Sequence, residues 1–435
     1  MIKRILDTLN IEALNAMQLA AIEAIDTHQD TILLSPTGSG KTLAFLLPVL
    51  KNLRKENNLV QVLVLTPSRE LAIQIEQVFK SMNTGFKVSC CYGGHKMSIE
   101  KNNLTEPPAL LVGTPGRILD HITRENFATT GIHTLVLDEF DKSLELGFKD
   151  EMSAIILSLK SVNKRILTSA TQALEIPEFT GIREPMVLDF LDKKVAPASL
   201  HCNIVKSVHK DKLSALFQLL CLIGGEQTLV FCNHRDAAKR VSDSLTDSSV
   251  VNEYFHGGLE QPVRERVLGK FRNGSCNILV CTDLASRGLD IPEVKHVIHY
   301  HLPQNKEAYI HRNGRTARMH AGGDSYLILS QEESVPAYIE DELNIIELSD
   351  ERILPPKPLW GTLYIGKGKK DKLNKVDIVG FLMQRGNLAK EEIGLIEVKD
   401  FFSYVAVKRT RINVLMQAVH DQKIKNKKTI IEECI

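Results

Sequence analysis

A glycine-rich stretch near the N-terminus, Ser35-Pro36-Thr37-Gly38-Ser39-Gly40-Lys41-Thr42, has the residue types that hold a phosphate chain. It lies between an apolar run and a leucine-rich segment, which predicts a strand, a loop and a helix. Backbone N–H groups of such a loop and the positive end of the helix attract phosphate oxygens. We therefore expect Lys41 to reach the β- and γ-phosphates of a nucleotide and Thr42 to bind Mg²⁺. Ser35 stands where the usual pattern has glycine, and the structural alternative is a plain turn.

Three acidic residues follow another apolar run, 135–137, about a hundred residues later. Asp138 is placed to hold Mg²⁺ through water, since Mg²⁺ prefers oxygen ligands and keeps part of its hydration shell. Glu139 could orient and deprotonate an attacking water. The structural alternative is an acidic N-cap, and we expect Asp141 to cap a helix that begins at Lys142.

Two hydroxyl residues, Ser169 and Thr171, follow a further apolar run, 165–168. Their side chains could hydrogen-bond Asp141 or bind a ligand, although Ser and Thr also commonly cap helices. They are expected at the same end of the sheet as the acids, because ligands in open α/β sheets bind at the carboxyl ends of the strands.

Apolar runs alternate with amphipathic stretches, which predicts βαβ units and parallel sheets. A second alternation starts near His201 and has no phosphate loop. We expect a second α/β domain without its own nucleotide site. The predicted strands are 60–66, 109–113, 134–137, 165–168 and 186–190 in the first half, and 227–231, 252–255, 277–280, 296–299 and 325–329 in the second.

The stretch His311-Arg312-Asn313-Gly314-Arg315-Thr316-Ala317-Arg318 lies in this second half. Arg315 and Arg318 are three residues apart, so on a helix both guanidinium groups would share one face. Two such cations could stabilise charge on a transferring γ-phosphoryl group. The alternative is a solvated basic helix face.

These motifs together resemble those of the DEAD-box RNA helicases in order and spacing, over roughly residues 10–345. The matching segments are Gly38–Thr42, Pro67–Leu71, Gly93-Gly94, Thr114–Arg117, Asp138–Asp141, Ser169–Thr171, His256-Gly257, Thr282–Asp290 and His311–Arg318. The resemblance implies an α/β fold with two tandem RecA-like domains that close on ATP, Mg²⁺ and single-stranded RNA. It also implies an RNA-stimulated ATP hydrolase.

The resemblance assigns roles to individual residues. Contacts with the RNA backbone are implied for Pro67, Arg69, Gly94, Thr114, Arg117, Arg264, Thr282 and Gly288. Arg315 and Arg318 are implied as arginine fingers, and Asp290 is implied near the ribose of ATP. Coupling between the domains is implied for Asp141, Ser169, Thr171, Arg287 and His311.

Two positions depart from the family pattern. Phe140 replaces the alanine of the Asp-Glu-Ala-Asp tetrad, so a larger side chain must pack behind the metal site. Gln18 stands where the family reads adenine, but the Pro-Thr that usually precedes this glutamine is absent and the expected upstream aromatic residue falls at Met1. Selectivity for adenine is therefore less strongly indicated than phosphate binding.

The C-terminal region is basic and has its own pattern. Residues 357–435 carry sixteen Lys/Arg and nine Asp/Glu, an excess of seven positive charges, whereas the whole chain is only +1. The rest is therefore at −6, and such a basic tail suits a polyanion. After the proline-rich segment 354–358 we expect strands and helices in the order βαββαβ, typical of an RRM-like α+β domain. Its first strand runs into a Gly/Lys loop suited to phosphates, with Lys367, Lys369 and Lys370.

This tail resembles the RNA-binding domain of DbpA-type DEAD-box helicases, which implies structured ribosomal RNA and pre-ribosomal particles as partners. The resemblance rests on Thr362–Ile365, the Gly/Lys loop, 375–378, 393–394 and 403–407. Its aromatic signature is degraded, and Tyr364, Phe402 and Tyr404 could be core or stacking residues. The expected divisions are 1–193 and 194–346 for the RecA-like domains, 347–359 for a linker and 360–435 for the RRM-like domain.

The composition excludes several classes of protein. No apolar run approaches the ~20 residues of a membrane span, and the N-terminus lacks a signal peptide. Eight cysteines without a C-x-x-C pair indicate reduced thiols rather than disulfides or zinc. We expect a cytoplasmic monomer that binds no membrane.

The main hypothesis is an ATP-dependent RNA helicase. A non-enzymatic RNA-binding clamp with a decayed ATP cycle is the alternative, supported by Phe140 and the weak Gln18 motif. A DNA helicase would use the same backbone contacts, but the RRM-like tail favours RNA. A metabolic P-loop kinase would leave the arginine pair unexplained.

Overall fold

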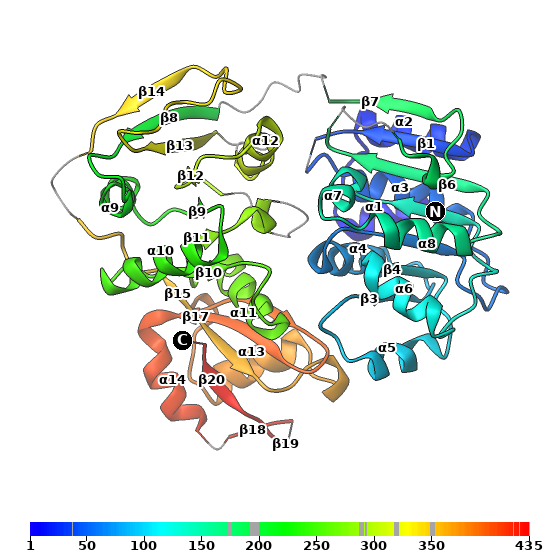
Figure 1. Ribbon diagram of the computed structural model, residues 1–435. Helices are drawn as coiled ribbons and strands as arrows, with labels where there is room; N and C mark the ends of the chain where they lie inside the picture. Colours follow the sequence, from blue (N-terminus) through cyan, green and yellow to red (C-terminus); the bar gives the residue numbers. More distant parts are fainter. Residues whose placement is uncertain are drawn as a thin grey trace. The chain divides into compact units, whose positions relative to one another are not determined.

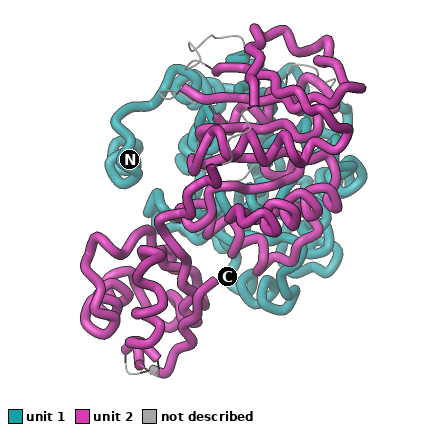
Figure 2. Tube along the Cα trace, turned by 90° about the vertical axis from the view of Figure 1, so that its left-hand side faces the viewer, with its two compact units in different colours: residues 1–195, 287–290 teal, residues 196–286, 291–435 magenta. Residues whose placement is uncertain are grey.

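The computed structural model describes residues 1–36, 38–171, 176–191, 200–286, 291, 294–316, 322–348, 353–420, 422–425 and 427–434. These residues form two compact units (Figure 2). The first contains residues 1–195, and the second contains residues 196–286 and 291–435. Among the described residues, no helix is long and apolar enough to cross a membrane.

The first unit is built on a seven-stranded parallel sheet with the order β3-β4-β2-β5-β6-β1-β7. Its short strands are bounded by turn residues, as the alternating apolar runs predict. The strands are β1 (Asp30–Leu34), β2 (Val62–Leu65), β3 (Val88–Cys91), β4 (Leu110–Gly113), β5 (Thr134–Leu137), β6 (Lys164–Ser169) and β7 (Met186–Asp189).

Helices cover both faces of this sheet (Figure 1). Alternate strand residues point to opposite faces, so Leu33 and Val64 belong to one buried cluster and Ile32 and Leu63 to the other. The first cluster includes residues of α2, α3 and α4, and the second includes residues of α6 and α8. The helices are α1 (Ile2–Leu9), α2 (Ala16–Thr27), α3 (Lys41–Lys51), α4 (Arg69–Ser81), α5 (Met97–Leu104), α6 (Pro115–Thr123), α7 (Phe140–Glu145) and α8 (Lys149–Ser158), with the 3-10 turn η1 (Glu178–Thr180).

The second unit begins with another seven-stranded parallel sheet, of order β10-β11-β9-β12-β13-β8-β14. Its strands are β8 (Leu200–Lys206), β9 (Thr228–Phe231), β10 (Glu253–Phe255), β11 (Ile278–Cys281), β12 (His296–His299), β13 (Gly323–Leu329) and β14 (Leu343–Ile346). Its helices are α9 (Leu213–Ile223), α10 (Arg235–Asp247), α11 (Gln261–Arg272) and α12 (Lys306–Asn313), with the 3-10 turn η2 (Asp283–Ser286).

The same unit ends in a small domain with a four-stranded antiparallel sheet of order β16-β17-β15-β20. This domain, residues 360–434, is called the C-terminal module below. Its strands are β15 (Trp360–Ile365), β16 (Ile393–Val398), β17 (Ser403–Lys408) and β20 (Ile431–Glu433). Its helices are α13 (Lys375–Gln384) and α14 (Ile412–Val419), with the 3-10 turns η3 (Lys369–Asp371), η4 (Lys390–Glu392) and η5 (Arg409–Arg411).

The predicted fold class is confirmed: two parallel α/β sheets precede a small βαββαβ domain. The sequence pattern did not indicate the short hairpin of β18 (Lys423–Ile424) and β19 (Lys427–Lys428), which lies between α14 and β20. The last strand, β20, follows this hairpin.

Candidate active site and nucleic-acid surface

The phosphate loop joins β1 to α3, as predicted. Gly40 precedes the helix with φ +88°, in the left-handed region that favours glycine. A Cβ atom at Gly40 would lie 2.5 Å from Nε2 of Gln18, so a side chain there would displace that amide. Ser35 and Ser39 bond to each other through their hydroxyl groups at 2.7 Å. Gly38 has φ +83°, and Thr37 lies outside the described residues.

Lys41 points back into this loop. Its Nζ donates to the carbonyl oxygens of Ser35 (2.6 Å) and Pro36 (2.9 Å). Burial lowers the pKa of Lys41, and the nearby carboxylates of Glu139 and Asp138 oppose that shift. A buried ammonium group thus lies close enough to two acids to feel their charge, and such clusters of shifted groups mark candidate functional sites.

Gln18 belongs to the same site through a capping box at the start of α2. Its backbone N–H donates to Oδ1 of Asn15 (2.9 Å), and its side-chain oxygen accepts from the Asn15 N–H (3.0 Å). The amide groups of both side chains donate to the phosphate loop: Gln18 to the Gly40 carbonyl (3.3 Å) and Asn15 to the Ser39 carbonyl (3.0 Å). Gln18 thus lies beside the phosphate loop, and its reading of adenine remains a prediction.

The acids follow β5 at its carboxyl end. Asp138 is buried, and its Oδ1 accepts a 2.5 Å hydrogen bond from the hydroxyl of Thr168. The same hydroxyl accepts from the backbone N–H of Glu139 (3.2 Å). Burial raises the pKa of Asp138, whereas the Thr168 hydrogen bond and the Lys41 charge lower it. Thr168 was not predicted as a site residue, although it is a hydroxyl residue at the end of a predicted strand and directly precedes Ser169.

Asp141 has the predicted partner but not the predicted cap position. The hydroxyl of Thr171 donates to its Oδ2 at 3.3 Å, and the Ser169 hydroxyl accepts from the Thr171 N–H at 3.0 Å. Helix α7 begins at Phe140 rather than Lys142, and its N-cap is Glu139, with φ +47°. The expectation that Asp141 caps this helix was wrong, because the chain already turns into the helix two residues earlier.

Phe140 is fully buried, and its ring lies 6.3 Å from the ring of Phe179. It belongs to the apolar cluster on one face of the sheet. The larger side chain therefore packs into the core, while Asp138 and Glu139 remain at the strand end.

The residues implied in RNA binding lie at the other half of the same sheet edge. Pro67 and Arg69 follow β2, Gly94 follows β3 and Thr114 follows β4, and these three strands are neighbours. A Cβ atom at Gly94 would lie 2.6 Å from Nη1 of Arg69, and Gly94 has φ +91°. The bare glycine therefore lets the Arg69 guanidinium lie directly on the loop.

Arg117 follows Thr114 in the first turn of α6, but its guanidinium group is turned towards protein atoms. Its Nε lies 2.9 Å from Oε2 of Glu100 and 3.3 Å from the Tyr92 carbonyl, to which it donates. Its Nη2 donates to the carbonyl of His95. Sequence reasoning missed Glu100, which lies in α5, the first helix after the Gly-Gly pair, and is the only acid in that helix.

In the second unit, an arginine that was not predicted organises the arginine-rich segment. Arg312 is fully buried and donates from Nε and Nη2 to the two oxygens of Asp283, at 2.5 and 3.1 Å. It also donates to Oδ1 of Asn233 (2.8 Å) and to the carbonyl of His301 (2.8 Å). Arg312 therefore fixes the turn directly after Thr282 against α12.

The expectation that Arg315 lies on a helix was wrong. Helix α12 ends at Asn313, and Arg315 lies in the following turn, where its carbonyl accepts from the Val294 N–H at 3.0 Å. Because Arg315 is not in a helix, the expected helical face that would pair it with Arg318 is absent at this residue. The structure places Arg315 and His311 in buried positions, with Thr282 half-buried. Arg287, Gly288, Asp290 and Arg318 lie outside the described residues.

Arg264 lies in α11 and is buried, with its guanidinium carbon 5.4 Å from the ring centre of Phe255. A cation over an aromatic face is held in place electrostatically. The family-implied contact of Arg264 with phosphate remains a prediction.

The C-terminal module rests on α11 and the turn that follows it (Figure 1). Arg272 forms two hydrogen bonds with the Glu397 carboxylate, at 2.7 and 3.0 Å. The amide of Asn273 donates to the Thr362 hydroxyl at 2.9 Å. A Cβ atom at Gly269 would lie 3.2 Å from the Tyr404 ring, so the two surfaces are in direct contact.

These contacts involve the face of the module sheet that is turned away from its helices. Leu363 and Val405 point to the helix side and belong to the module core, so their neighbours Thr362 and Tyr404 point to the other side. Thr362 and Tyr404 are both buried. Of the three aromatic residues considered, Tyr404 is therefore a docking residue, whereas Tyr364 and Phe402 are half-buried beside it, with ring centres 5.8 Å apart.

The predicted Gly/Lys loop is exposed at its centre. Lys369 and Lys370 form the start of η3 and are exposed, whereas Lys367 is half-buried and pairs with Asp371 at 3.1 Å. Lys425, from the β18–β19 hairpin, donates to the Lys372 carbonyl at 2.7 Å. The hairpin thus adds further lysines beside the loop.

Three family models match the chain. They are the DEAD/DEAH box helicase model at residues 15–179, the helicase conserved C-terminal domain at residues 211–320 and the DbpA RNA binding domain at residues 362–433. The first covers the phosphate loop and the acids, the second covers Arg312 and Arg315, and the third covers the module.

Whole-length relatives are also found. The chain is 32% identical to the ATP-dependent RNA helicase DbpA of Escherichia coli, over 97% of this chain and 94% of the relative. It is 28% identical to the protein of the same name in Bacillus subtilis, over 98% and 96% of the two chains. Among solved structures it resembles S. cerevisiae Dbp5 bound to RNA and ADP BeF3, with a TM-score of 0.70 and 25% identity over 79% of this chain and 92% of that one.

Proposed function

The chain belongs to the DEAD-box ATP-dependent RNA helicases of the DbpA type, and on this premise we propose that it remodels RNA locally by ATP-driven closure of its two RecA-like domains, directed to ribosomal RNA by the C-terminal module. The observation that carries the proposal lies in the first sheet. The nucleotide residues follow β1, β5 and β6, and the RNA residues follow β2, β3 and β4. The Asp138 N–H donates to the Leu65 carbonyl at 2.9 Å, so the two halves meet at β2 and β5.

The nucleotide residues suit Mg²⁺ and ATP. Asp138 and Thr42 offer the oxygen ligands that Mg²⁺ prefers, and the bound ion would neutralise charge on the phosphates. Lys41, which donates to two loop carbonyls, would donate to phosphate oxygens instead. Glu139 would orient the attacking water and accept its proton. Thr168 holds the start of this acidic turn in place.

The need for closure follows from the way the site residues are distributed between the two domains. Lys41 and Glu139 belong to the first domain and Arg315 to the second, so a site that needs all three is complete only when the domains close. If RNA also contacts both domains, ATP and RNA each favour the closed state and their affinities are coupled. A regular duplex would not fit a closed cleft that bends one strand, which accounts for local strand separation.

The non-enzymatic clamp has little support at the site. That alternative depended on Phe140 disturbing the metal site, yet Phe140 packs into the apolar core beside Phe179. Gln18, the other weak point, contacts the phosphate loop. A working ATP site is therefore the better account.

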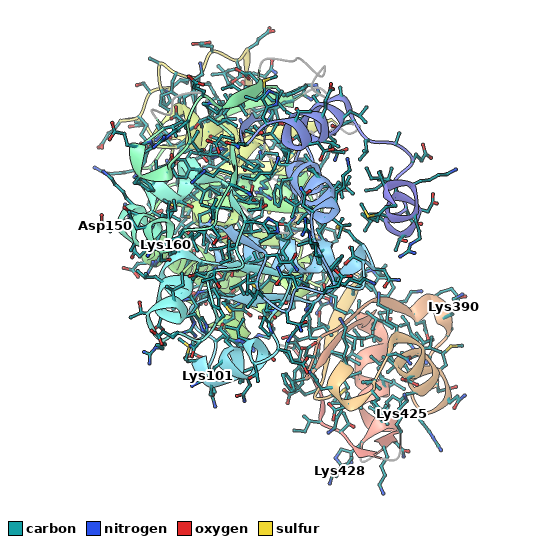
Figure 3. All side chains as sticks on the ribbon, turned by 90° about the vertical axis from the view of Figure 1, so that its right-hand side faces the viewer. Lys101, Asp150, Lys160, Lys390, Lys425 and Lys428 are labelled. Carbon is teal, nitrogen blue, oxygen red and sulfur yellow. The ribbon has the colours of Figure 1, made fainter. Side chains whose placement is uncertain are left out.

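For the module, we propose that structured RNA binds the basic surface of η3 and the neighbouring hairpin. The sheet face that an RRM-like domain would offer to bases is partly covered by α11, whereas Lys369, Lys370, Lys423, Lys425 and Lys428 are exposed. Figure 3 shows Lys425 and Lys428 projecting from the module. Lysines at this density suit the phosphates of a folded RNA and would make binding depend on salt.

The test is ATP hydrolysis without RNA, with a generic single strand and with ribosomal RNA. We expect strong stimulation by ribosomal RNA and weak stimulation by the generic strand. The double variant Lys369→Glu/Lys370→Glu should remove this preference while basal hydrolysis stays unchanged. Lys390→Glu is the matched control, because Lys390 is also exposed on the module but lies far from Lys428 in Figure 3. Equal stimulation by both RNAs would refute the ribosomal targeting but leave the helicase activity intact.

A further inference from the structure

A single buried carboxylate lies behind two of the loops implied in RNA binding. Glu100, in α5, is 1% exposed. Its Oε1 accepts a 3.1 Å hydrogen bond from the backbone N–H of Tyr92, the residue before the Gly-Gly pair. Its Oε2 lies 2.8 Å from Nε2 of His121 and 2.9 Å from Nε of Arg117. Both oxygens of this one side chain are therefore engaged by different segments of the chain.

The protonation states in this cluster follow from its hydrogen bonds. Burial alone would raise the pKa of Glu100, but the hydrogen bonds from His121 and the Tyr92 N–H, the His95 ring 3.6 Å away and the charge of Arg117 lower it. An ionised carboxylate can only accept, so Nε2 of His121 must carry the proton. The Asn126 amide lies 3.0 Å from Nδ1 of His121 and can donate to it. Both ring nitrogens of His121 thus have a partner, and the guanidinium of Arg117 supplies a positive charge beside Glu100.

This arrangement joins two segments that are far apart in the sequence. Arg117 donates to the carbonyl groups of Tyr92 and His95, on either side of Gly93-Gly94. Glu100 holds both the Tyr92 N–H and the Arg117 guanidinium. The Gly-Gly loop after β3 and the Thr114–Arg117 turn after β4 therefore depend on one shared anchor.

We propose that Glu100 is a positioning residue for RNA: its carboxylate holds the Gly-Gly loop and the Thr114–Arg117 turn in the geometry that binds the RNA backbone. The inference rests on the RNA-contacting roles proposed for these two segments. In this arrangement Arg117 bonds to protein atoms and orders the Gly94 loop through its hydrogen bonds to the Tyr92 and His95 carbonyls. Preorganised loops bind more tightly, because less ordering entropy remains to be lost on binding.

A metal site is the competing explanation of the same cluster. Donor atoms of Cys91, Glu100 and His121 lie within 4.8 Å of one another. Burial raises the pKa of the Cys91 thiol, which disfavours the thiolate that a metal needs. Glu100 and His121 are already bonded to each other, and Nδ1 of His121 faces Asn126. A hydrogen-bonded anchor accounts for the contacts of Glu100 and His121.

The test is the variant Glu100→Gln in the full-length protein. Glutamine keeps the shape but loses the charge that holds Arg117, and its amide hydrogens would face the donors of Arg117 and His121. We expect the RNA concentration for half-maximal stimulation to rise about tenfold or more, which corresponds to about 1.4 kcal/mol per factor of ten. Basal ATP hydrolysis and the KM for ATP should stay unchanged, because Lys41, Asp138 and Glu139 follow β1 and β5, whereas Glu100 contacts the segments that follow β3 and β4. A merely structural defect would instead reduce basal ATP hydrolysis together with the RNA-stimulated rate.

Controls separate the outcomes. Glu76→Gln removes a carboxylate on α4 that pairs with Lys80 at 2.9 Å near the surface, and it should change none of the constants. In an Arg117→Gln background the effect of Glu100→Gln should shrink, because both residues act through the same contacts. An unchanged RNA requirement in Glu100→Gln, or an equal loss of basal hydrolysis, would overturn the proposal. So would stoichiometric zinc in the purified protein that disappears in Cys91→Ala. Absence of RNA stimulation in the unmodified protein would instead count against the proposed function.

Discussion

The hydroxyl of Thr168 offers a sharp test of how the acidic site works. Thr168 lies on β6 and is fully buried. It donates to Oδ1 of Asp138 at 2.5 Å and accepts from the Glu139 N–H at 3.2 Å. Valine has nearly the same shape and can make neither bond. We predict that Thr168→Val lowers both the rate of ATP hydrolysis and the free energy of unfolding.

The magnitude follows from the two lost hydrogen bonds. A hydrogen bond to a charged group contributes about 1.5–3 kcal/mol, and a buried N–H left without an acceptor costs about 1–3 kcal/mol. If about 1.4 kcal/mol of this loss raises the activation free energy of hydrolysis, the turnover number drops about tenfold. The remainder should appear as reduced stability in urea-induced unfolding.

The pH dependence of activity and stability tests the same role of Thr168 independently. The Thr168 hydrogen bond lowers the pKa of Asp138, against the larger effect of burial that raises it. Without this bond the pKa of Asp138 rises further, so ionised Asp138 is lost at a higher pH. The acidic limb of the activity profile should therefore move to higher pH. The stability deficit should be largest at neutral pH and shrink as the pH falls, because protonation of a raised-pKa acid favours the folded state.

The assay is steady-state ATP hydrolysis at saturating RNA between mildly acidic and neutral pH, beside urea unfolding. Thr134→Val is the matched control, since Thr134 is also buried in the same sheet but lies at the start of β5, where its hydroxyl is 2.9 Å from Nδ1 of His133. It should lower stability without moving the pH profile. If Thr168→Val keeps its turnover and its acidic limb, the proposed role of this hydroxyl is refuted.

Three further predictions follow from the same structure. Lys41→Ala should abolish ATP turnover, because no other cation is predicted in the phosphate loop, and normal turnover would contradict the site. Gly94→Ala should raise the RNA concentration needed for stimulation, since its Cβ would lie 2.6 Å from Nη1 of Arg69 and its φ is +91°; a filter-binding measurement with unchanged affinity would argue against it. Arg272→Ala should leave the Glu397 carboxylate with fewer partners at the module contact and destabilise the protein by roughly 1.5–3 kcal/mol, the contribution of a hydrogen bond to a charged group. It should also speed proteolysis before residue 360, and unchanged proteolysis would show that this pair does not hold the module.

The site could be read from the sequence where its residues are neighbours in the chain. The phosphate loop, the Asp138–Glu139 pair and the Gly/Lys loop are each contiguous, and local patterns of glycine, charge and apolar residues indicate them. The same patterns indicated the alternating strands and helices, because burial on a sheet requires apolar runs at regular intervals. Family resemblance then added roles that no local pattern contains.

Residues that act through contacts between distant segments could not be found in this way. Thr168 bonds to acids thirty residues earlier, and Glu100 joins residues 92 and 117. Arg312 was passed over for Arg315, because the sequence does not show that α12 ends at Asn313 and turns Arg312 towards Asp283. The contact of Tyr404 with Gly269 could not be predicted from the sequence either.

The sequence by itself thus determined the order of the domains, the chemistry of the ATP site and the basic character of the tail, since these depend on composition and on short-range spacing. Only the tertiary structure decided which side chains share hydrogen bonds, where α7 and α12 begin and end, and which face of the module is covered. The physical reason is that these features depend on the register of parallel strands and on packing between faces. Both bring together residues whose separation along the chain carries no signal of their contact.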